Sequence, residues 1–117
     1  MSPTLSPARQ KTLTAFYDGA THKDARRIRS ALTDDFTFDG PIGAHDNPDS
    51  FVQSLLAFDG QVTRSRMIAE GDSLVHTYVL DFGVKIPMCD VIAFRGDKLA
   101  SIVLYTDPAL FAASPTH

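Results

Sequence analysis

Asp90 is the residue of this sequence whose type and setting most strongly indicate chemistry. It lies in Ile86–Phe94, which predicts a β-strand, and residues two apart on a strand share a face. The residues that share its face are apolar: Ile86, Met88, Ile92 and Phe94. A carboxylate is rarely placed among such neighbours unless it is paired or stays protonated. Two interpretations follow: a buried acid satisfied by a hydroxyl or a backbone amide, or an acid held neutral that donates a hydrogen bond into a cavity.

Four further side chains could join Asp90. Tyr17 falls on the apolar stripe of a predicted helix, so its ring belongs to the core, and its hydroxyl needs a partner if buried. Tyr78 and His76 share an apolar strand face, where a lone histidine is more often a satisfied core residue than a base. Asp39 alternates with two phenylalanines and therefore faces the surface, unless a bulge at the following glycine turns it inward.

The composition of the chain limits the classes of protein and of partner to which this chemistry could belong. The chain has 117 residues, 44% of them hydrophobic and 21% charged, which is typical of a single globular domain spanning 1–117. A net charge of −3 without a run of Lys or Arg argues against nucleic-acid binding. The scattered histidines have no metal-ligand spacing, and we expect neither a metal nor another cofactor. With no bilayer-length apolar run, no signal segment and a single cysteine, we expect a cytoplasmic protein that does not enter membranes.

Three helices are predicted in the first half of the chain. Ser6-Pro7 starts the first, whose apolar stripe recurs at i, i+3, i+4 and i+7 from Leu13. A second is expected over about 23–32, and Asn47-Pro48 starts a third. A short strand at Phe36–Asp39 separates the second helix from the third.

Four strands are expected after residue 60, joined by hairpin turns into an antiparallel meander: Gln61–Glu70, Ser73–Phe82, Ile86–Arg95 and Leu99–Thr106. Turn lengths predict the register. A three-residue turn at 83–85 places Tyr78 opposite Asp90, and a two-residue turn at 96–97 places Val103 opposite Asp90. The same register places Met88 opposite Tyr105.

One face of the predicted sheet is therefore large, aromatic and sparsely polar, and three amphipathic helices would cover it. A pocket on this face would hold a small apolar ligand, and its expected lining is Phe38, His76, Tyr78, Met88, Ile92 and Tyr105.

The opposite face does not alternate to polar residues at its centre, where Val75, Cys89 and Val91 fall. Since the helices are used on the other side, we expect a homodimer packed sheet to sheet. The alternative is that the segment 107–117 folds back over this face.

The order helix, helix, short strand, helix and four-strand meander resembles the nuclear transport factor 2-like superfamily, in its SnoaL-like and ketosteroid isomerase-like branch. The matching segments are Ala15–Tyr17, Asp34–Pro41 and Asp90–Phe94. The resemblance implies an α+β cystatin-like fold, in which a cone-shaped, curved antiparallel sheet wraps around three N-terminal helices.

The isomerase pattern implies an oxyanion-donating tyrosine at Tyr17 and a protonated, oxyanion-donating aspartate at Asp90. A neutral carboxylic acid in that role is documented for ketosteroid isomerase. The general-base aspartate of the pattern would fall just before Pro41, where this chain has Gly40, with Asp39 one place earlier. The implied catalytic set is therefore Asp90, Tyr17 and a displaced Asp39.

Three functions stay open from the sequence. The first is cofactor-free proton transfer on a small apolar carbonyl compound, as in an isomerase or cyclase, with Asp39 or His76 moving the proton. The second is a binding module that uses the same pocket without catalysis. The third is an assembly role, with the cone filled by its own side chains.

Overall fold

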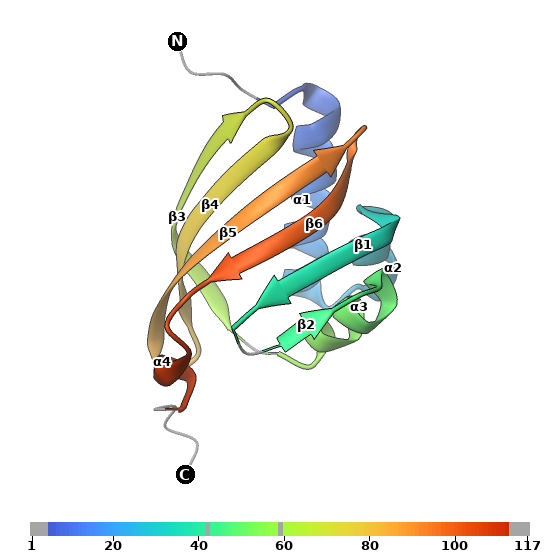
Figure 1. Cartoon of the computed structure of the whole chain (residues 1–117). Coiled ribbons are helices and arrows are strands. Elements are labelled where there is room, and N and C mark those ends of the chain that lie inside the picture. The colour runs from blue at the N-terminus through green and yellow to red at the C-terminus, as the bar shows by residue number, and fades with distance from the viewer. Residues whose placement is uncertain (1–4, 42, 59, 113–117) are drawn as a thin grey trace.

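The structure is a computed structural model that describes residues 5–41, 43–58 and 60–112, with side chains described as far as residue 110. Within these residues four helices and six strands follow one another (Figure 1): α1 Pro7–His22, α2 Ala25–Ser30, β1 Leu32–Gly40, β2 Gly43–His45, α3 Pro48–Leu56, β3 Gln61–Glu70, β4 Ser73–Asp81, β5 Lys85–Arg95, β6 Lys98–Tyr105 and α4 Pro108–Ala112. The first three helices lie behind one curved sheet, and α4 lies at its lower end. This arrangement confirms the predicted α+β class.

The sheet has six strands in the order β2-β1-β6-β5-β4-β3, and it is mixed rather than wholly antiparallel. The meander from β3 to β6 is antiparallel, as expected, whereas β1 pairs with β6 in parallel. The expectation for the first strand was too short, since β1 begins at Leu32. The expected loop before α3 contains a short strand, β2, whose His45 pairs with Phe38.

Both predicted helix starts are capped as the sequence suggested. The Ser6 hydroxyl accepts the Arg9 backbone N–H at 3.2 Å, and the Asn47 side chain accepts the Ser50 backbone N–H at 2.9 Å, each with a proline following the cap. Helix α1 ends at His22, and its C-cap residue Lys23 has a left-handed φ of 58° that turns the chain toward α2. No helix in the described part of the chain is long and apolar enough to cross a membrane.

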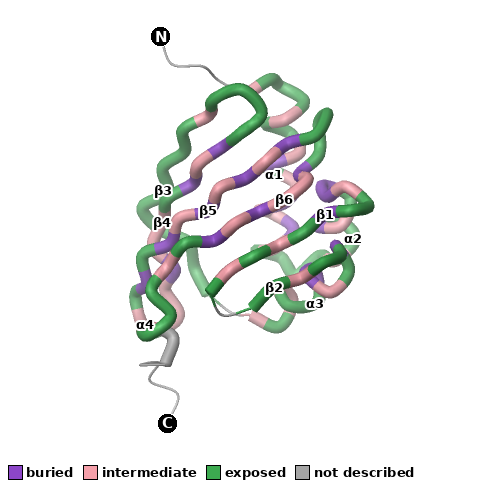
Figure 2. Tube along the Cα trace, viewed as in Figure 1, coloured by how far each residue is buried: buried purple, intermediate pink, exposed green. Residues whose placement is uncertain are grey.

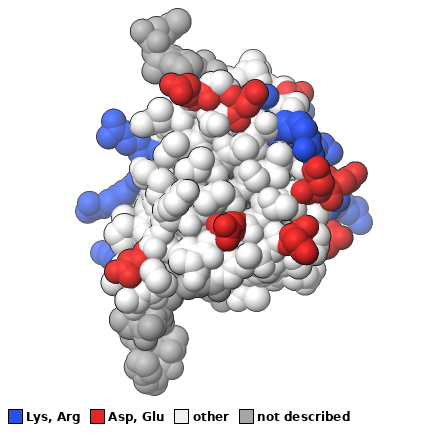
Figure 3. Space-filling view, viewed as in Figure 1, with Lys and Arg blue, Asp and Glu red and all other residues white. Residues whose placement is uncertain are grey.

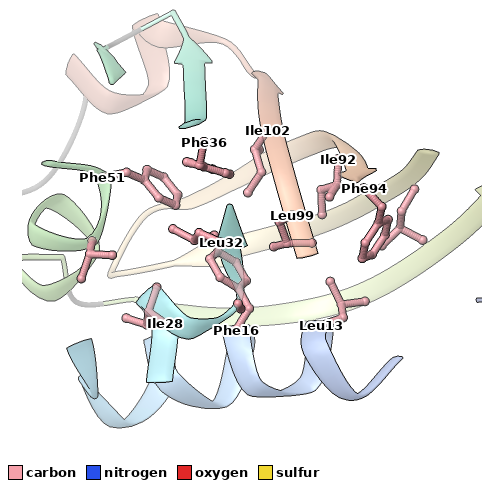
Figure 4. Packing of buried hydrophobic residues seen from close by; sticks show 13 residues of the cluster. Leu13, Phe16, Ile28, Leu32, Phe36, Phe51, Ile92, Phe94, Leu99 and Ile102 are labelled. Atoms are coloured by element: carbon pink, nitrogen blue, oxygen red, sulfur yellow. The ribbon is translucent and has the colours of Figure 1, made fainter. Parts of the chain in front are cut away.

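The core lies between the three helices and the inner face of the sheet (Figure 4). Leu13 and Phe16 of α1, Ile28 of α2 and Phe51 of α3 contribute the helical side. The sheet contributes a second set of buried side chains: Leu32, Phe36, Leu74, Ile92, Phe94, Leu99 and Ile102. A smaller cluster lies toward the α4 end of the sheet, around Leu80, Ile86, Met88 and Leu104. The two clusters leave a stretch of inner face between them, and the polar side chains discussed below occupy it.

The β4–β5 register differs from the expected one by two residues. Leu80, not Phe82, pairs with Ile86, and His76, not Tyr78, lies opposite Asp90. The cause is the turn, which uses residues 82–84 with Gly83 at φ 98° in the middle. Since a strand repeats every two residues, this shift leaves every side chain on its expected face.

The β5–β6 register differs by one residue, which does change faces. Arg95 pairs with Lys98 as expected, but a bulge then places Ala93 opposite Ser101 and Leu104 opposite Asp90. Packing explains the bulge, because it lets Leu99, Ile102 and Leu104 all be buried on the inner face. The expectation that Val103 and Tyr105 lie on the inner face was therefore wrong.

The outer face of the sheet is open to solvent and apolar at its centre. Along β5 and β6 buried and partly exposed residues alternate (Figure 2), and the partly exposed set includes Val91 and Val103. In the same view most charged atoms lie toward the edges, acidic groups also lie in its lower middle, and uncharged residues cover most of the centre (Figure 3). Exposed apolar side chains extend the surface at both sides, with Ile68 at 59% and Tyr105 at 61% exposed.

Gly19 is required by the close approach of α1 and α2. A Cβ atom at Gly19 would lie 2.9 Å from the Ile28 Cγ1 atom and 3.0 Å from its backbone nitrogen. Helix propensity alone would make Gly19→Ala stabilising by about 1 kcal/mol. We expect the contact to dominate and the variant to lose about 1–3 kcal/mol in the free energy of unfolding, measured by chemical denaturation. Gly43→Ala is the control, because its Cβ would meet no atom within 4 Å; equal stability changes in the two variants would contradict this account.

Candidate functional site

Asp90 lies on the inner face of β5, as the alternation of the strand predicts. Its neighbours two residues away, Met88 and Ile92, are both buried, and Asp90 itself is only 7% exposed. Leu104 of β6 is directly opposite on one side and His76 of β4 on the other. The carboxyl group is therefore held between an apolar neighbour and a polar one.

One hydrogen bond satisfies part of this carboxyl group. The Tyr78 hydroxyl donates to Asp90 Oδ2 at 2.9 Å, and the other oxygen, Oδ1, has no hydrogen-bond partner among the described residues. Burial raises the pKa of Asp90 to about 6, and the Tyr78 hydrogen bond opposes that shift by favouring the charged form. At pH 7 Asp90 is therefore mostly a carboxylate, and it becomes mostly the neutral acid below pH 6. Asp90 is therefore the expected neutral hydrogen-bond donor only below about pH 6.

His76 is the second buried polar group of the inner face, and it is 1% exposed. Its Nδ1 atom lies 2.5 Å from the Tyr17 hydroxyl, and the Ser65 hydroxyl is hydrogen-bonded to Nε2. Burial lowers the pKa of His76 to about 4, so the ring is neutral at pH 7. Both ring nitrogens are thus occupied by hydroxyl groups, and neither is bonded to Asp90.

Two tyrosine rings pack around His76. The Tyr17 and His76 rings meet edge to face with centroids 5.0 Å apart, and the Tyr78 ring is tilted against His76 at 4.4 Å. Burial and the nearby Asp90 carboxylate raise the pKa of both phenols, so both hydroxyls stay protonated. Both tyrosines are only partly buried, whereas Asp90 and His76 are buried. The two phenols are therefore more accessible to solvent than the carboxyl group and the imidazole that they contact.

Of the other residues expected to line a pocket, most lie on the inner face. Phe38 of β1 packs against both apolar clusters, Met88 belongs to the smaller cluster, and Ile92 is fully buried in the larger one. Tyr105 is the exception, because the β6 bulge places it on the outer face. It pairs there with Cys89.

Asp39 lies away from this group. It is exposed on β1, where its register partner in β6 is Val103 of the outer face. No inward bulge at Gly40 appears, since Gly40 continues the β1–β2 ladder opposite Gly43. The surface interpretation of Asp39 is therefore the one the structure favours, and the displaced base of the isomerase pattern does not join Asp90.

Ser65 is the polar contact that the sequence did not single out. A bulge between Thr63 and Arg66 places two residues, Arg64 and Ser65, where Tyr78 is the single residue opposite. Arg64 takes up the distortion with a φ of 55°. A register argument cannot reveal that a serine in a bulge reaches the histidine two residues further along the partner strand.

Two shallow grooves lie on the outer side of the sheet rather than beside Asp90. The larger, of about 520 Å³, runs past Pro87, Cys89 and Tyr105 to Leu110 of α4. The smaller, of about 370 Å³, lies next to it around Arg64 and Lys85. In the described part of the chain no three His, Cys, Asp or Glu side chains come together as they would to hold a metal ion.

Comparison with known proteins agrees with the fold. The SnoaL-like domain family matches residues 13–102, and the chain belongs to that family. No protein with a curated description matches the sequence significantly.

Solved structures extend the comparison at low sequence identity. An NTF2-like protein of unknown function from Cytophaga hutchinsonii is 17% identical with a TM-score of 0.82, covering 96% of this chain and 99% of its own. A Kribbella flavida protein, provisionally named a ketosteroid isomerase, is 11% identical with a TM-score of 0.74, covering 86% and 78%. An LEH-like epoxide hydrolase of M. tuberculosis is 18% identical with a TM-score of 0.69, covering 90% and 87%. These likenesses establish the NTF2-like fold, but at such low identity they do not establish the chemistry of this chain.

Asp90 and His76 contribute to the pH dependence of stability with opposite signs. The pKa of Asp90 is higher in the folded chain than its usual 3.8, so its contribution to stability is present below pH 4 and is lost as the pH rises to 6. The pKa of His76 is lower than its usual 6.5, so its contribution is present above pH 6.5 and is lost as the pH falls to 4. Each shift corresponds to about 3 kcal/mol.

Single variants separate the two contributions. When the pH falls from 7 to 4, we expect the free energy of unfolding of Asp90→Asn to fall by about 3 kcal/mol relative to that of the wild type. Over the same interval the free energy of unfolding of His76→Gln should rise by a similar amount relative to the wild type. Urea denaturation at several pH values measures both. Parallel stability curves for wild type and both variants would contradict the burial of these two groups.

Proposed function

We propose that this chain is a small-molecule pocket protein that catalyses cofactor-free proton transfer on a small apolar carbonyl compound. The observation that carries the proposal is the free oxygen of Asp90. A buried carboxyl oxygen normally has a hydrogen-bond partner, and Oδ1 has none among the described residues. A ligand that offers a proton at this oxygen would supply the missing partner.

The pKa of Asp90 suits this task. With a pKa of about 6, the group is a carboxylate at pH 7 and still accepts a proton readily. It takes a proton from the carbon next to the carbonyl group onto Oδ1, and that C–H electron pair forms the enolate. Returning the proton to a different carbon completes an isomerisation, with no other reactant needed.

The tyrosines would hold the charge that develops on the carbonyl oxygen. When the Tyr17 oxygen accepts the Nδ1–H of His76, its own proton is free to be donated to the enolate oxygen. Tyr78 stays bonded to Oδ2 of Asp90 and fixes the orientation of the carboxyl group. The apolar lining, with Phe38 and Met88, would bind the rest of the ligand and exclude water.

The fold supports this assignment without specifying the substrate. The Kribbella flavida and M. tuberculosis proteins of the same fold carry the names of a ketosteroid isomerase and an epoxide hydrolase. The cytoplasmic location stays a prediction from the single cysteine of the sequence.

A non-catalytic ligand-binding module is the second candidate, and one observation favours it. The base of the isomerase pattern is missing from the site, because Asp39 lies on the outer face. In that case Asp90 and Tyr17 would only orient a bound apolar ligand. Binding without proton exchange at the ligand is the outcome that separates this candidate from the first.

Asp90→Asn tests the catalytic proposal, because asparagine keeps the size of the side chain and cannot take up the proton. We expect it to slow the isomerisation of a β,γ-unsaturated cyclohexenone by about 100-fold or more, measured by the ultraviolet absorbance of the conjugated product. Wild-type activity should rise with pH through about 6, as Asp90 ionises. Asp39→Asn is the control, since it removes an exposed carboxylate from the other face and should leave the rate unchanged.

Two results would end the catalytic proposal. One is full activity in Asp90→Asn. The other is binding of the cyclohexenone by the wild-type protein, observed by NMR, without exchange of its acidic hydrogens for deuterium in heavy water.

We also propose that the outer face of the sheet forms a homodimer. The first three helices lie on the inner face, and the described part of α4 lies at the end of the sheet rather than over its centre (Figure 1). The central outer-face residues, among them Val75, Val91 and Val103, are left partly exposed. The alternative cover is the segment 107–117, whose residues 113–117 lie outside the described residues.

Val91→Asp tests the dimer, because a charge at the centre of a sheet-to-sheet contact would be desolvated without a partner. We expect light scattering to give a dimer for the wild type and a monomer for this variant, with unchanged circular dichroism. Thr14→Asp on the exposed side of α1 adds the same charge elsewhere and should stay dimeric. A monomeric wild type, or a dimeric Val91→Asp, would contradict the proposed interface.

A further inference from the structure

His76 joins two hydroxyl groups that come from different elements. Tyr17 of α1 lies 2.5 Å from Nδ1, and Ser65 of β3 is hydrogen-bonded to Nε2. The imidazole is 1% exposed, whereas Ser65 is exposed on the edge strand of the sheet. The line of contacts therefore runs from a phenol, through a buried imidazole, to a hydroxyl that a reagent in solution can reach.

Local structure fixes this contact. The β3 bulge inserts Arg64 and Ser65 opposite Tyr78, with Arg64 in the left-handed region at φ 55°. A residue other than glycine rarely takes this conformation, and bulges are frequent beside functional sites, where they redirect a side chain. The tyrosine rings on either side of His76 hold its ring orientation. Both partners of the Ser65–His76 contact are thus held in place before any ligand binds.

At pH 7 His76 has the unprotonated ring nitrogen that a base needs, and the burial that keeps it neutral also makes it a weaker proton acceptor than an exposed imidazole. Because burial keeps His76 neutral, one ring nitrogen carries a proton and the other has a lone pair. When the Tyr17 oxygen accepts the Nδ1–H bond, the lone pair of Nε2 faces the Ser65 hydroxyl. Nucleophile, base and orienting group then stand in the order found in serine hydrolases, with a phenol in place of the carboxylate.

We propose that Ser65 is a nucleophile that attacks carboxylic esters with small apolar acyl groups and is acylated by them. His76 is its base, and Tyr17 is the positioning residue. The apolar preference comes from Met67, which lies two residues from Ser65 opposite His76 and is 42% exposed. This activity is separate from proton transfer at Asp90, because it uses the edge of the sheet and does not need the free oxygen of that carboxyl group.

The reaction balances with water as the second substrate. Ser65 Oγ bonds to the ester carbonyl carbon as His76 Nε2 takes the hydroxyl proton. The bond from that carbon to the leaving oxygen then breaks, and His76 gives the proton to the departing alcohol. Water, activated in the same way, attacks the acyl-serine, releases the carboxylic acid and restores the Ser65 hydroxyl.

Acylation by p-nitrophenyl acetate tests the proposal. We expect a burst of p-nitrophenolate and a single acetyl group that peptide mapping places on Ser65. Ser65→Ala should abolish both, whereas Ser73→Ala, which removes an exposed serine from the neighbouring strand, should label as the wild type does. Because Ser65→Ala leaves the buried Nε2 atom of His76 without this partner, circular dichroism and urea denaturation check that the variant stays folded under the assay conditions.

Two further variants test the roles of the partners. His76→Gln should slow acetylation of Ser65 by about 100-fold or more, as loss of a general base does. Tyr17→Phe should slow it less and change the pH dependence of the rate, because the tautomer of His76 is no longer fixed. Acetylation that maps to lysines alone, an undiminished burst in Ser65→Ala, or equal rates in wild type and His76→Gln would each overturn the proposal.

Discussion

Removing a carboxyl group and an imidazole ring from water costs free energy, and the inner face of this sheet buries both, side by side on neighbouring strands. Asp90 and His76 are register partners, yet they do not bond to each other. Each depends on hydroxyl groups instead: Tyr78 for the carboxyl group, and Tyr17 with Ser65 for the imidazole. This arrangement keeps the ring neutral and leaves one carboxyl oxygen without a partner among the described residues. That oxygen is the proton acceptor of the proposed reaction.

The fold supplies those hydroxyls from three separate elements. Tyr17 comes from α1, which packs through Phe16 and Leu13 onto the sheet, and Ser65 comes from a bulge on the edge strand. Gly19 lets α2 approach α1 closely and so helps to set where that helix lies. Apolar clusters on both sides of the polar group exclude water from Asp90, and this exclusion raises its pKa. Packing and chemistry are therefore coupled through the same few side chains.

The sequence could predict which side chains share a face wherever strict alternation holds. Asp90 was placed on the inner face from β5 alone, and a two-residue error in the β4–β5 turn did not move any side chain off its face. Bulges break this logic. The spacing of Leu99, Ile102 and Leu104 contained a signal for the β6 bulge, which moved Tyr105 outward. The parallel pairing of β1 with β6 and the Ser65–His76 contact depend on tertiary packing, and no local pattern encodes them.

An NMR titration of the Asp90 side-chain carboxyl carbon shows whether burial disfavours the ionisation of this group. We expect a midpoint near pH 6, well above the usual value of 3.8, because burial opposes the negative charge more strongly than Tyr78 favours it. A midpoint at or below the usual value would mean that the carboxyl group is solvated or paired with a cation. That result would contradict the proposed site and leave only the fold.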